Sequence, residues 1–405
     1  MIEEKTRPAI SLESALTVAV GLFALFTPVS IASAHVSLGL AGLLLLAHRP
    51  SRAFAARLAR THSLRLPIVL WCAASVLATI FAVDQALSAG KLDKLALLSL
   101  LALGALPSVR AALPRILAVL IGSTTIVSVY GLAEHALAGG GLLARVRGIS
   151  GFYLTVAGIL MVVALLSLSI AIALSREGGG SRRGAALLAA AGLVIVAALG
   201  GTYARGSWLG FIAGALFLAR RRRVLLGGLA AALVLGYVVA PAPLKERVGS
   251  TFDPHHRLNQ ERLLIWKHGL SLLAERPWTG VGLVIPEPLM RREVKTADGV
   301  IRVHSHMHNA FLQVAVSMGV PALAVFVFLV ASFFKIGRRA ARTPPRSAWE
   351  AGLTAAYPAI LLALLVNGLV EWNFGDSEIL GLFYLISGFV LGIEADARPS
   401  AGTGA

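Results

Sequence analysis

Long apolar runs separated by short polar segments are the main pattern along this chain. They recur from residue 12 to residue 394, and most approach the roughly 20 residues that a helix needs to cross a bilayer core. Lipid-exposed backbone must satisfy its own hydrogen bonds, which favours helices. We predict an all-α integral membrane protein in which residues 1–405 form a single polytopic domain. The twelve predicted spans are residues 12–28, 31–48, 66–83, 94–108, 114–135, 152–175, 185–202, 206–219, 224–241, 309–335, 351–371 and 379–394.

One polar segment is much longer than the others. It covers residues 242–308, between the ninth and tenth predicted spans. Within it, residues 259–275 are predicted to form an amphipathic helix that ends at Pro277. The apolar positions on one face of this helix are Leu263, Trp266, Leu270 and Leu273. Such a helix either lies on the membrane surface or packs over the bundle.

The composition agrees with a membrane protein. Hydrophobic residues make up 57% of the chain and charged residues 14%, with a mean hydropathy of +0.79. These values exclude an ordinary soluble enzyme, in which about a quarter of the residues are charged. Cys72 is the one cysteine, so an intramolecular disulfide, a cysteine metal site and a redox pair are excluded.

The net charge of +17 acquires a meaning once it is placed on the predicted spans. In a soluble protein such an excess would suggest nucleic acid, but in a membrane protein Lys and Arg mark the cytoplasmic loops. If the N-terminus is cytoplasmic, the loops on that side hold 19 Lys and Arg, against five in the short loops opposite. Both termini are therefore predicted to be cytoplasmic and residues 242–308 periplasmic, with no nucleic acid partner.

The few cations on the outer side need an explanation. Arg205 lies in a tight turn, and the run after it, residues 206–219, spans roughly 21 Å, short of a core of about 30 Å. The short span should draw Arg205 below the surface, where a cation needs an anionic partner; the alternative is snorkelling to the interface. Arg262 opens the amphipathic helix, where a cation opposes the helix dipole. Arg147 precedes the sixth span, either as an interfacial anchor or as part of a site.

Three alternating histidines precede the tenth span: His304, His306 and His308. On an extended segment alternate residues share a face, so the three could ligate a metal such as zinc. Alternatively, one of them is a general base at the membrane surface and the others are structural. We favour the base, because Asp298 is the one carboxylate within ten residues of the cluster and a catalytic metal usually recruits carboxylates.

Three sequence elements together resemble the O-antigen ligase and O-antigen polymerase superfamily of bacterial envelopes. Tyr203 to Gly206 is similar to the family's Ser-Arg-Gly element, although Tyr203 and Ala204 stand where a serine often precedes the arginine. Arg262 to Gly282 resembles its Arg…Trp…Pro…Gly-x-Gly stretch, and His306 to Gln313 its His-x-His-Asn…Leu-Gln element. The elements cover about residues 200–325 and come in the family's order.

The resemblance implies a multi-pass enzyme of the bacterial inner membrane, with its site facing the periplasm. It would move a glycan from undecaprenyl pyrophosphate to a sugar hydroxyl of lipid A–core; a polymerase of the same family would extend a growing glycan instead. The expected site residues are Arg205, Arg262 and Arg147 for the pyrophosphate, His308 as the catalytic base, and His306, Asn309 and Trp266 as support.

The chemistry of these residue types agrees with that reaction. Arginine forks match phosphate oxygens in pairs and stabilise the charge that develops on a leaving pyrophosphate. A neutral histidine accepts the proton of a sugar hydroxyl near pH 7. The donor is already activated, so we expect no nucleotide, metal or other cofactor. The expected partners are the lipid-linked donor, the glycan acceptor and membrane lipids.

Two questions stay open at this point. A membrane transporter is disfavoured because the long segment follows the ninth span and the carboxylates lie in loops or near span ends, not at the midplane. Ligase and polymerase differ only in the acceptor, and the single large loop favours a ligase. The outward loop 371–378 is acidic; it either lines the acceptor entrance or follows the charge rule.

Overall fold

The structure is a computed structural model that describes residues 11–149, 151–179, 181–220, 222–251, 253–290, 292–296, 299–303 and 306–396. Within these ranges the chain is predominantly helical, as predicted. The described part also holds an antiparallel hairpin of β1 (Arg292–Thr296) and β2 (Gly299–Val303), which the sequence analysis did not anticipate. It lies within the long polar segment.

Eleven of the twelve predicted spans correspond to one helix each. Side-chain caps fix several starts: Ser30 begins α2, and Ser347 begins α17, by accepting backbone N–H groups. The eleven helices are α1 (Leu12–Phe26), α2 (Ile31–Ala47), α4 (Arg65–Ile80), α8 (Leu113–Leu137), α9 (Tyr153–Leu174), α10 (Ser181–Gly201), α11 (Arg205–Ala219), α12 (Arg223–Val239), α16 (Ala310–Ala340), α17 (Ala348–Gly368) and α18 (Ser377–Asp396).

The region predicted as the fourth span differs from expectation. Instead of one helix over 94–108, the chain forms the 3₁₀ helix η1 (Leu92–Leu98) and the short α6 (Ser99–Ala105). The Lys94 ammonium donates to the carbonyl of Gly375 beside α18, and α6 ends before Pro107, whose ring cannot continue a helix. Short helices flank this region: α5 (Gln85–Ala89) before it and α7 (Pro107–Ala111) after it.

Length and apolar composition make six described helices able to cross a membrane: α8, α9, α10, α16, α17 and α18. The number rises to eight if two bent pairs each form one span. These pairs are α2 with α3 (Arg49–Thr61), bent by 98°, and α12 with α13 (Ala242–Gly249), bent by 118°. The chain is a multi-pass membrane protein; the count of twelve and the orientation of the termini remain predictions.

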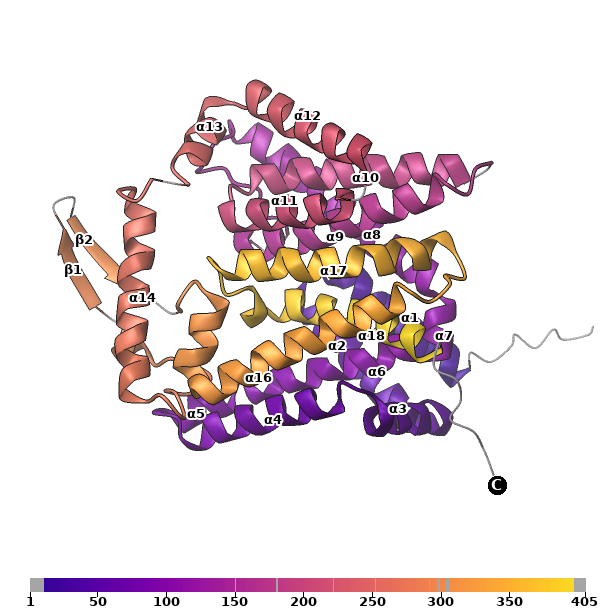
Figure 1. The fold of residues 1–405 in the computed structure, drawn as a ribbon, viewed down its shortest axis with the longest axis horizontal. Helices are drawn as coiled ribbons and strands as arrows, with labels where there is room; N and C mark the ends of the chain where they lie inside the picture. Colours follow the sequence, from indigo (N-terminus) through magenta and orange to yellow (C-terminus); the bar gives the residue numbers. More distant parts are fainter. Residues whose placement is uncertain are drawn as a thin grey trace, which may run out of the picture.

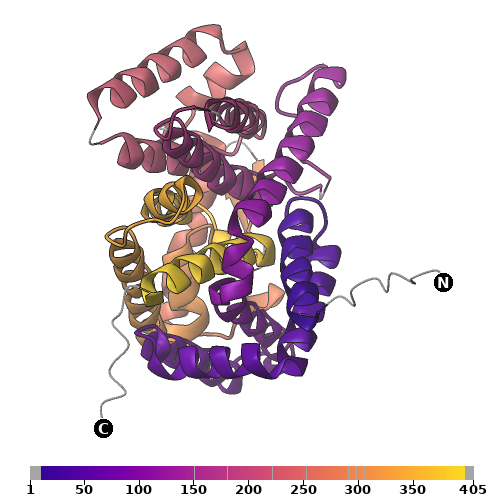
Figure 2. The same ribbon diagram turned by 90° about the vertical axis from the view of Figure 1, so that its right-hand side faces the viewer.

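Two helices form the centre of the bundle. α9 packs against α10 and α17, and α18 packs against α6 and α16; most side chains of α9 and α18 are buried. Figure 1 shows α16, α17 and α18 side by side, and Figure 2, turned by 90°, places α18 in the middle of the bundle. The ends of α11, α16 and α17 that carry the expected site therefore rest on a packed core.

The predicted amphipathic helix is α14 (Arg257–Glu275), which crosses the end of the bundle beside α16 (Figure 1). Its buried face differs in part from the predicted one. Ile265 and Leu272 are buried against the bundle, whereas Leu263 and Leu270 are more than half exposed. The predicted apolar face lies at the edge of the interface between α14 and the bundle, because packing against the bundle buries a neighbouring face of the helix. The hairpin stands beyond α14, and α15 (Glu287–Met290) precedes it.

A break in α16 receives the loop that follows α14. Gly319 has φ 86°, a left-handed conformation that favours glycine, and a Cβ there would lie 2.3 Å from the Trp278 carbonyl oxygen. In the same contact, the Val281 and Gly282 amides donate to the carbonyls of Val316 and Ser317 in α16, each at 2.9 Å. The Gly-x-Gly stretch is therefore a strap that fixes the first part of α16 against the end of α14.

Candidate active site

The turn before α16 presents two histidines on either side of a buried methionine. Met307 is fully buried; its N–H donates to Gln313 Oε1 and its carbonyl accepts from Trp266 Nε1, both at 2.8 Å. The Asn309 side chain caps α16 and also donates to the end of α17. His308 has φ 46°, a costly conformation for a residue with a side chain. Trp266, Asn309 and Gln313 thus hold the turn.

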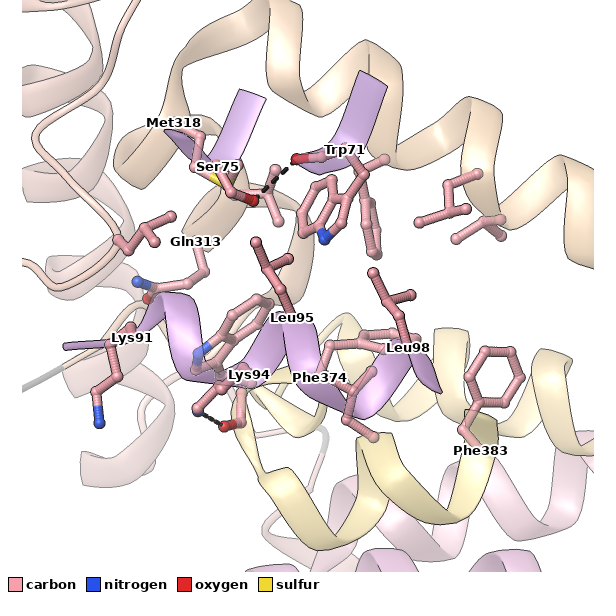
Figure 3. Close-up of a pocket in the computed structure, with 18 of the residues that line it drawn as sticks. Trp71, Ser75, Lys91, Lys94, Leu95, Leu98, Gln313, Met318, Phe374 and Phe383 are labelled. Carbon is pink, nitrogen blue, oxygen red and sulfur yellow. Dashed lines mark hydrogen bonds between the residues drawn. The ribbon is translucent and has the colours of Figure 1, made fainter. Parts of the chain in front are cut away.

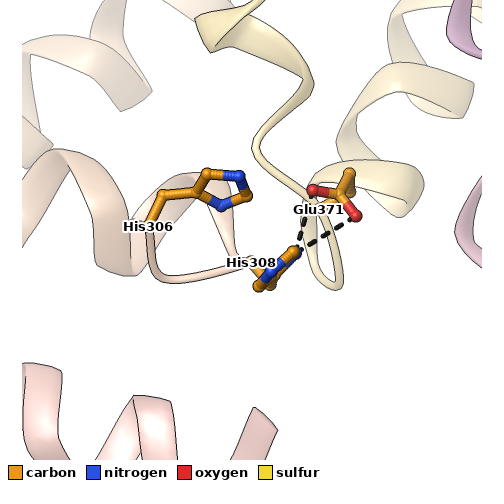
Figure 4. Close-up of side chains that lie close together, drawn as sticks. All are labelled: His306, His308 and Glu371. Carbon is orange, nitrogen blue, oxygen red and sulfur yellow. Dashed lines mark hydrogen bonds and ion pairs between the residues drawn. The ribbon is translucent and has the colours of Figure 1, made fainter. Parts of the chain in front are cut away.

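His308 forms a pair with a carboxylate from a distant segment. Its Nδ1 lies 3.0 Å and 3.3 Å from the two oxygens of Glu371, just after α17, and Figure 4 shows the two side chains facing each other. A neutral His308 that donates its Nδ1 proton to Glu371 leaves Nε2 free to accept a proton. The His306 ring lies beside it, with ring centroids 4.2 Å apart.

Burial and charge set the protonation of the neighbours of His308. Burial alone would raise the pKa of Glu371, but the hydrogen bond and charge of His308 outweigh it and lower that pKa. Burial, followed by repulsion from His308, lowers the pKa of His306 to about 4. Near neutral pH, Glu371 is therefore a carboxylate and His306 an uncharged ring, so a negative charge faces Nδ1 of His308.

A cavity of about 140 Å³ brings three of the seven expected residues together. We call it the arginine pocket. Arg205, Arg262 and His308 line it, and so does Glu371. Among the described residues, none of these arginines forms an ion pair with a carboxylate. Asn367 also lines the pocket, and its buried Oδ1 has no hydrogen-bond partner in the described part of the chain. The pocket thus combines arginines that form no ion pair in the described part of the chain, the carboxylates of Glu261 and Glu371, and an unfilled polar contact.

Arg205 is buried at the start of α11, as the short span predicted. It is 5% exposed, and its guanidinium donates to the Ser250 carbonyl at 2.7 Å and to Asn259 Oδ1 at 3.0 Å. Burial and then the charges of Arg247 and Arg262 lower the pKa of Arg205 to about 10. It therefore remains a cation at neutral pH, held in place by neutral acceptors from the long polar segment.

Arg247, which the sequence analysis missed, is a third cation of the arginine pocket. It lies in α13, and its Nε donates to the Tyr203 carbonyl at 3.3 Å. Burial, then the charge of Arg145, lowers the pKa of Arg247. Arg145 itself sits over the Tyr153 ring, 4.5 Å from its centroid. The only signal for Arg247 in the sequence was its place in the long polar segment, residues 242–308.

Arg147 does not reach the pocket in this structure. Its side chain is exposed and donates to a nearby carbonyl in its own loop at 3.5 Å, so Arg145 instead brings positive charge close to the site. His304 lies outside the described residues. Of the acidic loop 371–378, Glu371 enters the pocket, whereas Asp376 accepts a hydrogen bond from Thr155 on α9 at 2.9 Å.

The arrangement changes one premise of the sequence analysis. His306, His308 and Glu371 offer ligand atoms that all lie within 4.8 Å of one another, so they could hold a metal ion. The argument against a metal relied on the lack of a carboxylate near the histidines in sequence. Glu371 supplies one from 63 residues further along the chain. The choice between a base and a metal site therefore depends on chemistry and on experiment.

The comparisons with known proteins agree with the resemblance. Residues 190–327 match the family described as O-antigen ligase; this range includes Arg205, Arg247, Arg262, His306 and His308. No curated protein matches the chain. The family implies a glycosyltransferase-type enzyme of O-antigen processing that acts on lipid-linked glycans in the membrane. The chain is thus similar to the O-antigen ligase family over residues 190–327.

Proposed function

We propose that this protein is an O-antigen ligase. It transfers a glycan from undecaprenyl pyrophosphate to a sugar hydroxyl of lipid A–core at the periplasmic face of the inner membrane. The observation that carries the proposal is the arginine pocket itself, where three arginines without carboxylate partners adjoin a histidine–carboxylate pair. Twelve spans, cytoplasmic termini and a periplasmic segment 242–308 belong to the same proposal.

The arginines bind the pyrophosphate of the donor. Arg205 and Arg262 provide paired N–H donors that suit phosphate oxygens, and Arg247 adds a third cation. Because Arg205 is held by neutral acceptors, its charge is not cancelled before the donor arrives. As the bond between the sugar and the pyrophosphate breaks, negative charge grows on the leaving oxygen, and fixed cations stabilise that charge.

His308 is the base of the reaction. Its Nδ1–H donates a hydrogen bond to the Glu371 carboxylate, so Nε2 accepts the proton of the acceptor hydroxyl while the hydroxyl oxygen attacks the anomeric carbon. The sugar–oxygen bond forms, the pyrophosphate leaves with its electron pair, and the proton stays on His308 until solvent removes it. Glu371 stabilises the cationic ring in between. The reaction needs no nucleotide and, in this proposal, no metal.

The test is complementation of a ligase-null strain, with the ladder of O-antigen-capped lipopolysaccharide as the readout. We expect Arg262→Ala and His308→Ala to abolish the ladder, because a lost base alone costs on the order of 10²–10⁴-fold in rate. The matched controls are Arg257→Ala, an exposed arginine on the same helix, and His255→Ala, an exposed histidine. Both controls should restore the ladder. If the Arg262→Ala variant and the His308→Ala variant each restore the ladder, the assignment is refuted.

Two further readouts separate the remaining alternatives. Deleting the gene should leave lipid-linked chain lengths unchanged if the protein is a ligase, whereas an accumulation of single repeat units would indicate a polymerase. Purified protein should keep its transfer activity in EDTA. Activity that is lost in EDTA and restored by Zn²⁺ would instead assign His306, His308 and Glu371 as metal ligands.

A further inference from the structure

A groove at the opposite end of α11 from Arg205 has no part in the proposed reaction. It has a volume of about 500 Å³, within the range of small-molecule sites, and we call it the α12 groove. Side chains of α9, α10, α11 and α12 line it, most of them leucine or alanine. It shares no lining residue with the arginine pocket or with the aromatic cavity beside His306, where Trp71 and Phe383 lie (Figure 3).

Protein covers α12 only in part. This helix packs chiefly against α11, and Figure 1 shows it at the edge of the bundle, beyond α10 and α11. None of its described side chains is buried. Leu225 and Leu229, one turn apart, turn one face of α12 toward the groove. Because a groove lined by such side chains offers water few polar partners, we expect hydrocarbon to fill it.

One end of the α12 groove is positively charged. The loop between α9 and α10 and the loop between α11 and α12 meet there, because α9 and α11 end and α10 and α12 begin at that end. Arg182 lines the groove, Arg176 follows the lining residue Ser175, and Arg222 directly precedes α12. Burial, and then the charge of Arg222, lowers the pKa of Arg176, so the two cations are neighbours.

The carboxylate beside these arginines in the sequence is engaged elsewhere. The two oxygens of Glu177 accept hydrogen bonds from the Ala348 N–H at 3.0 Å and from the Ser181 hydroxyl at 3.3 Å. In the part of the chain that the structure describes, Arg176, Arg182 and Arg222 form no ion pair. Cations therefore lie at the end of a groove lined by hydrocarbon, which is the polarity that complements an anionic lipid.

We propose that the α12 groove binds an anionic phospholipid of the membrane, with acyl chains along α12 and the phosphate at Arg176, Arg182 and Arg222. Arginine forks match phosphate oxygens, and basic pockets between membrane helices bind anionic head groups. The site does not depend on the proposed reaction and is distinct from the site of the donor. Arg205 begins α11 and the lining residue Ala219 ends it, so the length of the helix, roughly 21 Å, separates the two.

The test measures lipid binding and needs no transfer activity. In native mass spectrometry, the detergent-purified full chain is titrated with dioleoyl phosphatidylglycerol and, separately, with dioleoyl phosphatidylcholine, which has the same chains and no net charge. Ala189→Trp fills the groove from α10. Ala190→Trp is the matched control, because Ala190 is the next residue of the same helix, is exposed and does not line the groove. Ala189→Leu is a milder second variant in case the larger side chain prevents folding.

The head group is tested with charge variants. We expect the wild type to bind phosphatidylglycerol more tightly than phosphatidylcholine. Arg182→Gln should weaken the binding of phosphatidylglycerol roughly fivefold, the effect of one cation near an anionic lipid surface, and should change the binding of phosphatidylcholine little. Arg342→Gln, an exposed control just after α16, should affect neither lipid. Equal affinity of the wild type for the two lipids would overturn the proposal.

The acyl chains are tested with the tryptophan variants. We expect Ala189→Trp to weaken the binding of both lipids roughly tenfold or more, because overpacking excludes the chains, and Ala190→Trp to leave both unchanged. If the two tryptophan variants bind phosphatidylglycerol alike, the groove is not the site. A wild-type dimer that Ala189→Trp converts to a monomer would also overturn the proposal, since the groove would then hold a second copy of the chain.

Discussion

His308 combines a left-handed backbone conformation with a hydrogen bond to the Glu371 carboxylate. A left-handed conformation costs a non-glycine residue about 1–2 kcal/mol, and here the buried Met307 and the Asn309 cap hold that conformation in place. Strain of this kind persists where the surroundings over-determine the geometry. The result is a ring fixed between Glu371 and the arginine pocket.

Glu371→Gln tests whether this carboxylate orients the base. The change keeps the size of the side chain but removes the charge that stabilises a protonated His308. We expect kcat to fall roughly 10- to 100-fold, as for other partners that orient a histidine, with little change in KM for the donor. Glu378→Gln, in the same loop, is the control. A fall in kcat of the same size in the control, or a change confined to KM, would contradict the orienting role.

Asp376 gives a prediction about stability and pH. Burial raises its pKa to about 6 from 3.8, so between these values the folded state holds a proton that the unfolded state has released. Stability from this group is complete below the ordinary value and is lost as the pH rises through 6. At pH 7, the free energy of unfolding of Asp376→Asn should therefore exceed that of the wild type by about 1–3 kcal/mol. The variant should accordingly unfold at a higher temperature.

The measurement is the apparent unfolding temperature in detergent between pH 4 and pH 7. The gap between Asp376→Asn and the wild type should close toward pH 4, where the wild-type carboxyl is protonated. The exposed Asp93→Asn serves as the control and should follow the wild type throughout. A gap that does not change with pH would show that the amide acts through packing instead.

Sequence reasoning identified the residues with strong local signals. Arg205 was proposed because a lone cation preceded a span too short to cross the core, and His308 because it belonged to a dense motif before a span; both line the arginine pocket. Glu371 and Arg247 were missed, because their roles depend on which segments fold together and neither belongs to a periodic pattern. The acidic loop 371–378 had been noted, but nothing in the sequence connects it with a turn 63 residues away.

At the scale of elements, the break in α16 is as important as its length. The sequence predicted a span at this position and a Gly-x-Gly stretch nearby. It did not predict that the loop carrying this stretch packs against α16 at the break at Gly319. Likewise, the periodicity of α14 predicted a helix but did not predict which face would be buried. Ile265 and Leu272 are buried because they pack against the bundle. Tertiary packing supplies what local spacing leaves out.

Gly319→Ala tests the strap. The added methyl group would lie 2.3 Å from the Trp278 carbonyl oxygen, and the left-handed backbone adds about 1–2 kcal/mol of strain. We expect a lower unfolding temperature and impaired transfer, because the strap and the histidine turn share the first part of α16. Gly122→Ala in α8, which has open space around it, should be neutral. If both variants unfold at the wild-type temperature, the strap does not contribute to stability.

At the scale of the whole molecule, the predicted orientation can be tested with the single native cysteine. After Cys72→Ser, one new cysteine is placed at Asp253 in the long polar segment or at Arg342 after α16. A membrane-impermeant maleimide added to intact spheroplasts should label Asp253→Cys, and should label Arg342→Cys only after permeabilisation. The reverse pattern would invert the orientation that the arginines predict.

The site draws its residues from widely separated parts of the chain: Arg205 begins α11, Arg262 lies in α14, His308 precedes α16 and Glu371 follows α17. A ribosome delivers these parts to the membrane in that order. Arg205 is synthesised first, but the partner of the base arrives only when α17 has been inserted. In the proposed mechanism, a chain that ends before α17 already carries the arginines for a lipid phosphate but lacks the carboxylate partner of the base. Under the proposed mechanism, we therefore expect no transfer before the segment after α17 has been synthesised.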